Sequence, residues 1–328
     1  MNVLVTGGAG YIGCHTVHAL RAKGHSVIAL DNLTTGHRSS VPKESLVEGD
    51  IADETLLSNV LTRERIEAVV ACAALADVPD SVANPGPYLE NNVAKGVAFL
   101  ECLRAHAVSL VVFSSSASVY GNPERIPICE DDTKRPTSPY GLSKLFMEQM
   151  LEWYDAAYGF RYVCLRYFCA AGAAPELGVG EDHRPERHLI PSVVLSALGQ
   201  RPPTEIYGTD YPTRDGTAVR DFVHVMDLAE AHIMALNHLV AGGSSLTLNV
   251  GLGQGFSVRQ VIQATERVTG HPVPVKLAPR RPGDPAELVA SPHALMRCLG
   301  WKPRFAQLDE IIASAWEWHK LHPRGFAL

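Results

Sequence analysis

The chain has 328 residues, which is enough for one large domain or two closely joined ones. With 46% hydrophobic and 20% charged residues, its composition is that of an ordinary globular protein and excludes disordered and collagen-like classes. The formal net charge of −6 excludes a broad basic surface for nucleic acid or an anionic membrane, but leaves room for a small basic cluster that binds a phosphate group.

The seven cysteines contain no C-x-x-C pair, so they predict neither a disulfide scaffold nor a structural zinc knot. Scattered free thiols are typical of a reducing compartment. No secretory leader pattern precedes the first strand, and the longest apolar run, residues 68–76, is far shorter than the ~20 residues of a membrane-spanning helix. We therefore expect a cytoplasmic protein that binds neither membranes nor nucleic acid.

The first half of the chain alternates short apolar runs with segments of helical length. The runs lack polar alternation, which is typical of strands buried on both faces of a parallel sheet. Predicted strands cover residues 3–6, 26–30, 45–47, 68–72, 110–114 and 162–165, and predicted helices cover 13–23, 52–63, 88–105 and 140–158. This series predicts an α/β fold with a doubly wound, Rossmann-type parallel sheet.

After about residue 170 the chain becomes richer in Gly, Pro and charged residues, although apolar segments continue. We expect a nucleotide-binding domain at 1–170 and a smaller α/β substrate lobe at 171–328, with some C-terminal segments returning to the first domain. Residues 221–239 predict a strand followed by a helix, and 257–269 predict another helix. A closing amphipathic helix is expected at 308–321, with Ile311, Ile312, Ala315 and Trp316 facing inward.

A glycine-rich loop, GGAGYIG at residues 7–13, follows the first strand and opens the first helix. It contains G-x-G-x-x-G, in which glycines let the backbone approach a pyrophosphate and the helix N-terminus supplies N–H groups. A glycine triplet alone is a weak signal, but the flanking strand and helix support a dinucleotide site. The residues expected to hold the cofactor here are Gly7, Gly10, Tyr11, Ile12 and Gly13.

Asp31 ends the second strand at the distance from Gly13 that suits a ribose-binding carboxylate. Such a carboxylate accepts from the ribose hydroxyls and repels a 2′-phosphate. Asn32, rather than an arginine, follows it, so NAD is preferred over NADP. Asp50 and Ile51 follow the next strand and are placed to contact the adenine; the alternative is that Asp50 or Asp53 caps a helix.

Tyr140 and Lys144 form a Y-x-x-x-K pair that lies on one face of a helix. Alone, this pair is typical of a solvated helix surface. Its context differs, because Pro139 precedes it and a serine-rich run, residues 114–121, follows the fifth strand. Residues just past the carboxyl ends of parallel strands face the ligand crevice, so this context favours a functional site over a solvated surface.

Taken together, these motifs resemble those of the UDP-glucose 4-epimerases in the extended short-chain dehydrogenase/reductase family. The resemblance runs from residue 1 to near the C-terminus, and its substrate-half motifs make it more specific than a Rossmann fold alone. The segments that carry it are residues 5–13, 30–33, 90–93, 114–121, 138–144, 165–168, 180–183, 188–191, 207–213, 215–217, 219–229 and 280–285.

This resemblance implies that Tyr140 takes the proton from the sugar 4-hydroxyl, while Ser116 hydrogen-bonds the reacting oxygen and shares the transfer. Lys144 is expected to hold the nicotinamide ribose. The positive charges of Lys144 and of oxidised nicotinamide are expected to lower the tyrosine pKa from ~10. The net redox change is zero, so NAD is expected to stay bound; the resemblance places Asn92, Ser114 and Phe168 against it.

For the nucleotide sugar, the resemblance implies that Arg220 and Arg281 hold the diphosphate and Asp284 the uridine ribose. Arginine suits this task because its planar fork pairs with phosphate oxygens. The alternatives are that Arg281 is a solvated loop charge and that Tyr207, expected near the uracil, is a core residue. Other residues implied to line the substrate are Cys169, His188, Leu189 and Leu288.

Three positions depart from the family pattern or leave it open. Cys169 stands where the family usually has Asn, Ala76 where some relatives carry Lys, and Leu288 has intermediate bulk at a position that tunes room for a 2-acetamido group. A UDP-hexose is the leading substrate, with UDP-N-acetylhexosamine, UDP-pentose or UDP-uronate as alternatives. A dehydratase is disfavoured because that family carries Asp-Glu just after the fifth strand, where this chain has Ser-Ala-Ser, residues 116–118. An NAD-binding regulator without turnover is a further alternative.

No metal site is predicted, because the histidine pairs 15/18, 183/188 and 319/322 each lack a third ligand at a suggestive spacing.

The helices at 88–105 and 140–158 resemble a pair that joins family members into homodimers. Their apolar residues are expected to form that interface or, alternatively, to pack inward on the sheet. They are Val97, Leu100, Leu103, Phe146, Met150 and Tyr154.

Overall fold

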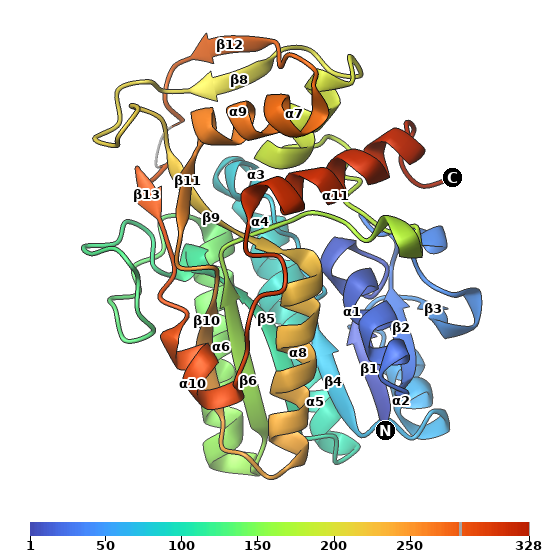
Figure 1. The fold of residues 1–328 in the computed structure, drawn as a ribbon. Coiled ribbons are helices and arrows are strands. Elements are labelled where there is room, and N and C mark those ends of the chain that lie inside the picture. Colours follow the sequence, from blue (N-terminus) through green and yellow to red (C-terminus); the bar gives the residue numbers. More distant parts are fainter. Residues whose placement is uncertain (282–283, 328) are drawn as a thin grey trace.

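A computed structural model describes residues 1–281 and 284–327. Its centre is a seven-stranded sheet in the order β10-β6-β5-β4-β1-β2-β3, in which every neighbouring pair is parallel (Figure 1). The strands are β1 (Asn2–Thr6), β2 (Ser26–Asp31), β3 (Leu46–Glu48), β4 (Ala68–Ala71), β5 (Leu110–Ser116), β6 (Arg161–Tyr167) and β10 (Leu246–Val250). The predicted doubly wound α/β fold is confirmed.

Helices cover both faces of this sheet, because alternate strand residues point to opposite sides. In β1, Val3 and Val5 belong to one buried cluster with α1 (Tyr11–Ala22) and α8 (Val225–Val240). Leu4 belongs to the opposite cluster, together with side chains from α2 (Glu54–Arg63), α5 (Lys95–Ala105) and α6 (Pro139–Tyr158).

The helix predicted at 88–105 is present, and residues 85–105 are helical without a break, but the helix is not a regular α-helix throughout. The structure has α3 (Val78–Ala83), α4 (Pro85–Leu89), a π-type turn η3 (Glu90–Ala94) and then α5. A π turn holds one more residue than an α turn, so it changes which side chain faces inward. Asn92 in this turn is buried and bonds the backbone of Leu75, a role that hydrophobic periodicity does not reveal.

Helix α6 carries its own start and stop signals. The Ser138 hydroxyl accepts a hydrogen bond from Gly141 N at 3.1 Å, and Pro139 occupies the first turn, where its missing N–H costs nothing. The helix ends at Gly159, whose φ of 74° is a left-handed conformation that favours glycine. These signals fix where Tyr140 and Lys144 enter the site.

The smaller lobe lies at the carboxyl ends of the large sheet (Figure 1). A four-stranded sheet joins β11, β9 and β13, with β7 paired to β9, and β8 and β12 form a parallel pair. Its elements are β7 (Cys169–Ala171), α7 (Leu189–Ala197), β8 (Thr204–Tyr207), β9 (Val219–His224), β11 (Gly255–Ser257), α9 (Val258–Thr269), β12 (Val275–Ala278), β13 (Glu287–Leu288) and α11 (Leu308–Leu321). We propose two lobes, residues 1–170 and 171–328, with α8, β10 and α10 (His293–Leu299) as segments that return to the first.

Helix α11 closes the smaller lobe. Ile311, Ile312 and Ala315 are buried in its core as predicted, but Trp316 is only partly buried. Trp318 is fully buried instead, among residues that pack near the first lobe. Within the described residues, no helix is long and apolar enough to span a bilayer.

Candidate active site

The glycine loop is tightly packed against neighbouring backbone atoms. Gly7 has φ 64°, and a Cβ there would lie 2.7 Å from Ala73 Cα; a Cβ on Gly13 would lie 2.0 Å from the carbonyl oxygen of Gly7. Gly10 caps α1 without any side-chain hydrogen bond, and the first turn, which includes Tyr11 and Ile12, contains no acidic residue. The N–H groups of this helix start are therefore available to an anion.

Asp31 lies beside this loop with a fixed orientation. Its carboxylate accepts from Ala9 N at 2.9 Å and from Leu33 N at 2.8 Å. Burial raises the pKa of Asp31 above its ordinary value, although these backbone N–H groups oppose the shift. The carboxylate thus stands at the end of β2 with acceptor capacity for a hydroxyl pair.

The next predicted cofactor residues lie at the end of β3. Asp50 accepts from Asn32 Nδ2 at 3.2 Å and pairs with Lys95 Nζ at 2.7 Å. The Asp50 pKa is lowered; its partial burial opposes this shift, and the Lys95 bond causes it. Asp53, not Asp50, caps α2. Ile51 and Asn92 both line a small cavity of about 30 Å³.

Asn92 is held by the protein itself. Its amide bonds both the N–H and the carbonyl of Leu75 at 2.9 Å, and it also donates to Ser143 Oγ at 3.1 Å. It therefore fixes the loop after β4 against α6. A direct contact with NAD stays a prediction.

The three predicted catalytic residues meet at the end of β5 and the start of α6. Ser116 ends β5 and its hydroxyl accepts from Ser118 N at 3.1 Å, while Tyr140 and Lys144 are buried one helical turn apart. Lys144 Nζ donates to the carbonyl oxygen of Ser114 at 2.7 Å and lies 5.9 Å from the Tyr140 ring centre.

Burial governs the pKa of both titratable groups in this protein without its cofactor. It raises the pKa of Tyr140, an effect that Ser116 partly offsets, and it lowers the pKa of Lys144 to about 8. The family resemblance predicts that Lys144 and oxidised nicotinamide together lower the tyrosine pKa. Lys144 alone does not overcome the desolvation of the phenol, so this expectation depends on the cofactor's charge.

Ser114, which was predicted to contact NAD, has a hydroxyl that lies 3.1 Å from both Cys72 Sγ and His232 Nε2. Burial lowers the pKa of His232 to about 4, so this imidazole is neutral at pH 7. Phe168 is buried and its N–H donates to the carbonyl of Val250 at 3.1 Å. Cys169 is partly buried at the start of β7.

The predicted diphosphate and ribose residues meet across the small sheet. Arg220 in β9 forms an ion pair with Asp284, and the neighbouring β13 places Leu288 beside Arg220 in register. Arg281 lies over the Tyr207 ring at 3.8 Å. Pro282 and Gly283, part of the same motif, lie outside the described residues.

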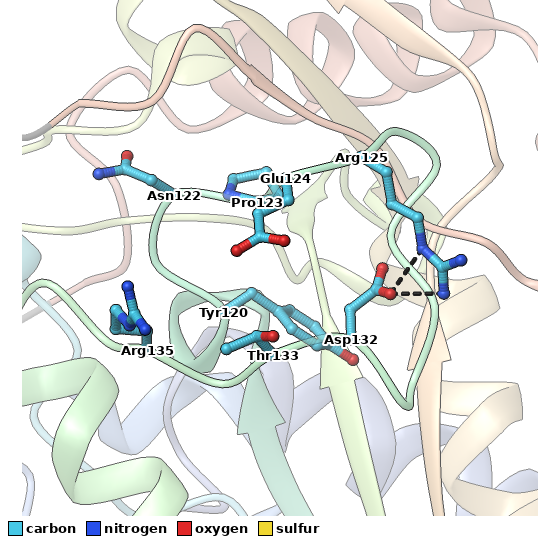
Figure 2. Close-up of a pocket in the computed structure, with 8 residues that line it drawn as sticks. All are labelled: Tyr120, Asn122, Pro123, Glu124, Arg125, Asp132, Thr133 and Arg135. Atoms are coloured by element: carbon cyan, nitrogen blue, oxygen red, sulfur yellow. Dashed lines mark hydrogen bonds and ion pairs between the residues drawn. The ribbon is translucent and has the colours of Figure 1, made fainter.

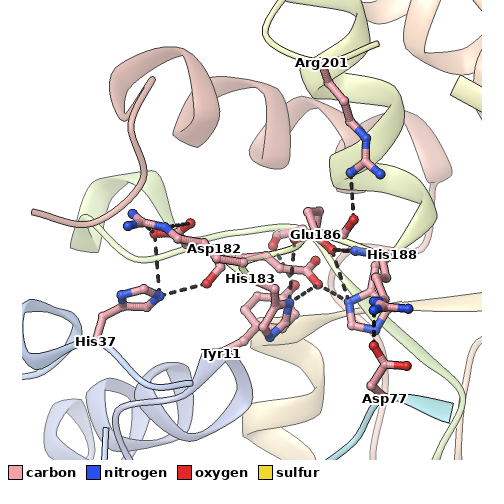
Figure 3. A network of polar contacts seen from close by, with 12 residues as sticks. Tyr11, His37, Asp77, Asp182, His183, Glu186, His188 and Arg201 are labelled. Atoms are coloured by element: carbon pink, nitrogen blue, oxygen red, sulfur yellow. Dashed lines mark hydrogen bonds and ion pairs between the residues drawn. The ribbon is translucent and has the colours of Figure 1, made fainter. Parts of the chain in front are cut away.

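His188 and Leu189 begin α7, next to a compact network of charged residues (Figure 3). His183 and His188 lie beside the carboxylates of Glu181 and Glu186. Burial disfavours the charged forms of these residues. The two histidines nevertheless lower the pKa of Glu181 to about 2, and the two carboxylates raise the pKa of His183 to about 10. Sequence spacing predicts no third ligand beside His183 and His188, whereas the fold brings two carboxylates to them.

A separate pocket of about 400 Å³ is formed by the loop after Tyr120, where Arg125 pairs with Asp132 at 2.6 Å (Figure 2). It contains none of the predicted site residues. We assign no ligand to it.

Sequence reasoning missed several residues that support the site. Lys95 pairs with Asp50, and Glu148 forms a buried ion pair with Arg166 at 2.6 Å. Glu148 had a usable signal, because it follows Lys144 by four residues and so shares the buried face of α6. Lys95 had none, since its partner is distant in sequence.

Comparison with known proteins gives a consistent result. Residues 3–251 match the model of the NAD dependent epimerase/dehydratase family. The UDP-glucose 4-epimerase of Halalkalibacterium halodurans is 50% identical over 327 residues, which cover 100% of this chain and 98% of the relative. The corresponding enzyme of Lacticaseibacillus casei is 48% identical, with 99% of each chain covered.

Two solved structures share this fold. The UDP-glucose 4-epimerase of Brucella ovis in complex with NAD has a TM-score of 0.93 at 45% identity, covering 96% of this chain and 97% of that one. The enzyme of Bifidobacterium longum in complex with NAD⁺ and UDP has a TM-score of 0.94 at 39% identity, covering 99% and 100%.

Proposed function

The chain belongs to the NAD dependent epimerase/dehydratase family, and from this premise we propose that it interconverts UDP-glucose and UDP-galactose by inverting C4 through a transient 4-keto sugar. The observation that carries the proposal is the buried group of Ser116, Tyr140 and Lys144 at the carboxyl end of β5. Family members named for this activity match the chain over its full length.

NAD fits the residues that would hold it. The uncapped start of α1 offers N–H groups to the pyrophosphate, and the tight packing of Gly7 and Gly13 leaves no room for larger side chains. Asp31 would accept hydrogen bonds from the adenosine ribose, and Lys144 would donate to the nicotinamide ribose. Bound NAD would supply hydride-transfer chemistry at sugar C4.

The chain's own residues would move the proton. Tyr140 takes the proton from O4 as the sugar is oxidised and returns it after the bound sugar has rotated to present its other face. Ser116 hydrogen-bonds the same oxygen. Because burial raises the pKa of Tyr140, the phenol needs an adjacent positive charge to ionise. Lys144 supplies one such charge.

The substrate side would use the cluster of Arg220, Arg281 and Asp284, with Tyr207 beneath Arg281. Arg220 would give up part of its ion pair with Asp284 and bind the diphosphate instead. Asp284 would then accept a hydrogen bond from the uridine ribose. Cys169, His188, Leu189 and Leu288 would line the remaining substrate surface.

The proposal is tested by incubating the purified protein with UDP-glucose, UDP-N-acetylglucosamine, UDP-xylose and UDP-glucuronate, and reading product stereochemistry by NMR. We expect UDP-galactose from UDP-glucose and slower conversion of the other sugars. Conversion of another sugar alone would change the substrate assignment. No conversion of any sugar would favour an NAD-binding regulator.

We also propose a cytoplasmic homodimer formed by α6 and its neighbours. Leu100, Leu103 and Tyr154 pack inward, so they do not supply the interface. Exposed apolar side chains follow one face of α6 and continue onto α3 and α4. They are Val82, Leu89, Leu142, Phe146 and Trp153.

Light scattering should report a dimer for the native chain and a monomer for Phe146→Asp/Trp153→Asp, because paired apolar faces do not tolerate buried unpaired charges. A native monomer would contradict the interface.

A further inference from the structure

Four side chains converge in the segment between β7 and α7. Glu181, His183, Glu186 and His188 each offer one ligand atom, and these atoms all lie within 4.8 Å of one another (Figure 3). His183 Nδ1 is 3.1 Å from Glu181 Oε1 and 3.6 Å from Glu186 Oε2, and His188 Nδ1 is 3.6 Å from Glu186 Oε1.

Three of these spacings are close to those around a tetrahedral ion. The fourth pair, His188 Nδ1 and Glu181 Oε1, is joined by a direct hydrogen bond, so an ion would have to replace that proton and separate the two atoms. Zinc binds histidine nitrogen and carboxylate oxygen at about 2.0–2.2 Å, so neighbouring ligand atoms of a tetrahedron are roughly 3.3–3.6 Å apart. Two imidazoles with two carboxylates also form a donor set that a borderline divalent transition metal accepts. The two carboxylate charges would neutralise such an ion.

The orientation of His183 separates this arrangement from a set of ordinary ion pairs. Its Nδ1 is buried and, despite the 3.1 Å contact with Glu181, is not aligned for a hydrogen bond with any described residue. A protonated imidazole paired with one carboxylate would aim its N–H at that oxygen. An imidazole that shares a central ion with both carboxylates would aim between them.

The ligands are held in place by bonds outside the cluster. Glu186 Oε1 accepts from the N–H groups of Arg187 and His188 at 2.8 Å each, which leaves Oε2 toward His183. The Glu186 carbonyl accepts from Arg201 at 2.8 Å, and Arg187 pairs with Asp77 at 2.7 Å. Such outer contacts orient metal ligands in known sites.

We propose that Glu181, His183, Glu186 and His188 form a binding site for one divalent transition-metal ion, with Zn²⁺ as the best fit. The site contains none of Ser116, Tyr140 and Lys144 and does not depend on the proposed epimerase activity. His188 would bind the ion through Nδ1, while its side chain, which is 59% exposed, would still border the substrate surface. It would brace the segment against the cofactor loop, because His183 packs edge-on against Tyr11 at 6.3 Å and Tyr11 Oη donates to the carbonyl of Gly172 at 2.7 Å.

The test uses the full chain without a histidine tag, since a tag would itself bind zinc. After dialysis against EDTA, zinc is titrated against a chromogenic chelator, and bound metal is counted by mass spectrometry. We expect one Zn²⁺ per native chain. In His183→Asn/Glu186→Gln, affinity should fall by more than the roughly 10–100-fold that loss of an outer partner costs.

The matched control, His293→Asn/Glu317→Gln, makes the same chemical changes at exposed positions and should bind zinc like the native chain. Co²⁺ gives a second readout on the native chain alone, because tetrahedral Co²⁺ absorbs visible light far more strongly than six-coordinate Co²⁺. The proposal is overturned if the native chain binds no zinc, if both double variants bind it equally, or if the Co²⁺ spectrum stays weak.

Discussion

At the scale of single residues, the ammonium group of Lys144 is held in a buried position by its contacts. Its ammonium donates to the Ser114 carbonyl at 2.7 Å and lies 5.0 Å from the Phe113 ring centre, inside the protein. Burial lowers its pKa to about 8, so the amine remains mostly charged at neutral pH. The phenol of Tyr140 lies one helical turn away, and in the proposed mechanism the charge of Lys144 favours its ionised form.

Tyr140→Phe should lower kcat by about 10²–10⁴-fold or more, because the sugar O4 loses its proton acceptor. NAD should remain bound, since the ring stays in place. A coupled assay measures turnover, and the absorbance of cofactor released on denaturation measures retention. Tyr158→Phe, at an exposed position of the same helix, is the control and should be fully active. Full activity of the Tyr140 variant would refute the mechanism.

Asp31→Asn should weaken NAD binding by roughly 10–100-fold, the cost of about 1.5–3 kcal/mol for a hydrogen bond to a charged group. It should also reduce discrimination against NADP, because the repelling charge is gone. Calorimetry with the cofactor-free protein measures both affinities. Asp53→Asn keeps an equivalent cap on α2 and should bind NAD normally. Unchanged affinity at Asp31 would contradict its assigned role.

At the scale of elements, α6 is fastened to the sheet by one buried carboxylate. Glu148 accepts from Ser115 Oγ of β5 at 2.5 Å and from Arg166 of β6 at 2.6 and 2.9 Å. Arg166 continues to Tyr120 Oη at 2.9 Å. This chain of bonds sets the depth at which Tyr140 and Lys144 enter the site.

Glu148→Gln should lower the free energy of unfolding by about 3–5 kcal/mol, because it leaves the Arg166 charge buried without its partner. Urea denaturation followed by circular dichroism measures the change. The control is Glu152→Gln. Glu152 lies one turn further along the same helix at an exposed position, so its substitution should change the free energy of unfolding by less than about 0.5 kcal/mol. Equal effects of the two substitutions would show that the pair does not anchor α6.

The elements also show how far sequence reasoning reaches. The glycine loop, Asp31 and the Tyr140–Lys144 pair were predictable because each signal is local, carried by spacing within one turn or one strand–helix unit. The pairing of Asp50 with Lys95 and the carboxylates around His183 depend on the paths of loops, which no local periodicity encodes. The π-type turn could not be predicted for the same reason, since the hydrophobic pattern of residues 88–105 is that of one amphipathic helix.

At the scale of the whole molecule, several histidines are buried in neutral form. Burial lowers the pKa of His15, His232 and His319 to about 4, and that of His224 to about 3. The unfolded chain binds these protons near pH 6.5, whereas the native state excludes them until about pH 4. The unfolded state therefore gains protons first, and stability falls as pH drops through this window.

The free energy of unfolding should therefore decrease from pH 6.5 toward pH 5, by about 1.4 kcal/mol per pH unit for each such histidine. Asp221 opposes this below pH 6, because burial raises its pKa to about 6. Urea titrations in EDTA measure the slope. His319→Leu should reduce it by one proton, and the exposed His293→Asn should not. A slope unaffected by His319→Leu would contradict the account.

The π-type turn at Glu90–Ala94 also bears on how this chain tolerates changes of length. Because a π turn holds one residue more than an α turn, deleting one residue there would leave an ordinary α turn and keep α4 and α5 in register. Asn92, however, would lose its bonds to Leu75 and Ser143, and the loop after β4 would lose this attachment to α6. The extra residue thus serves the placement of one buried amide rather than the course of the helix.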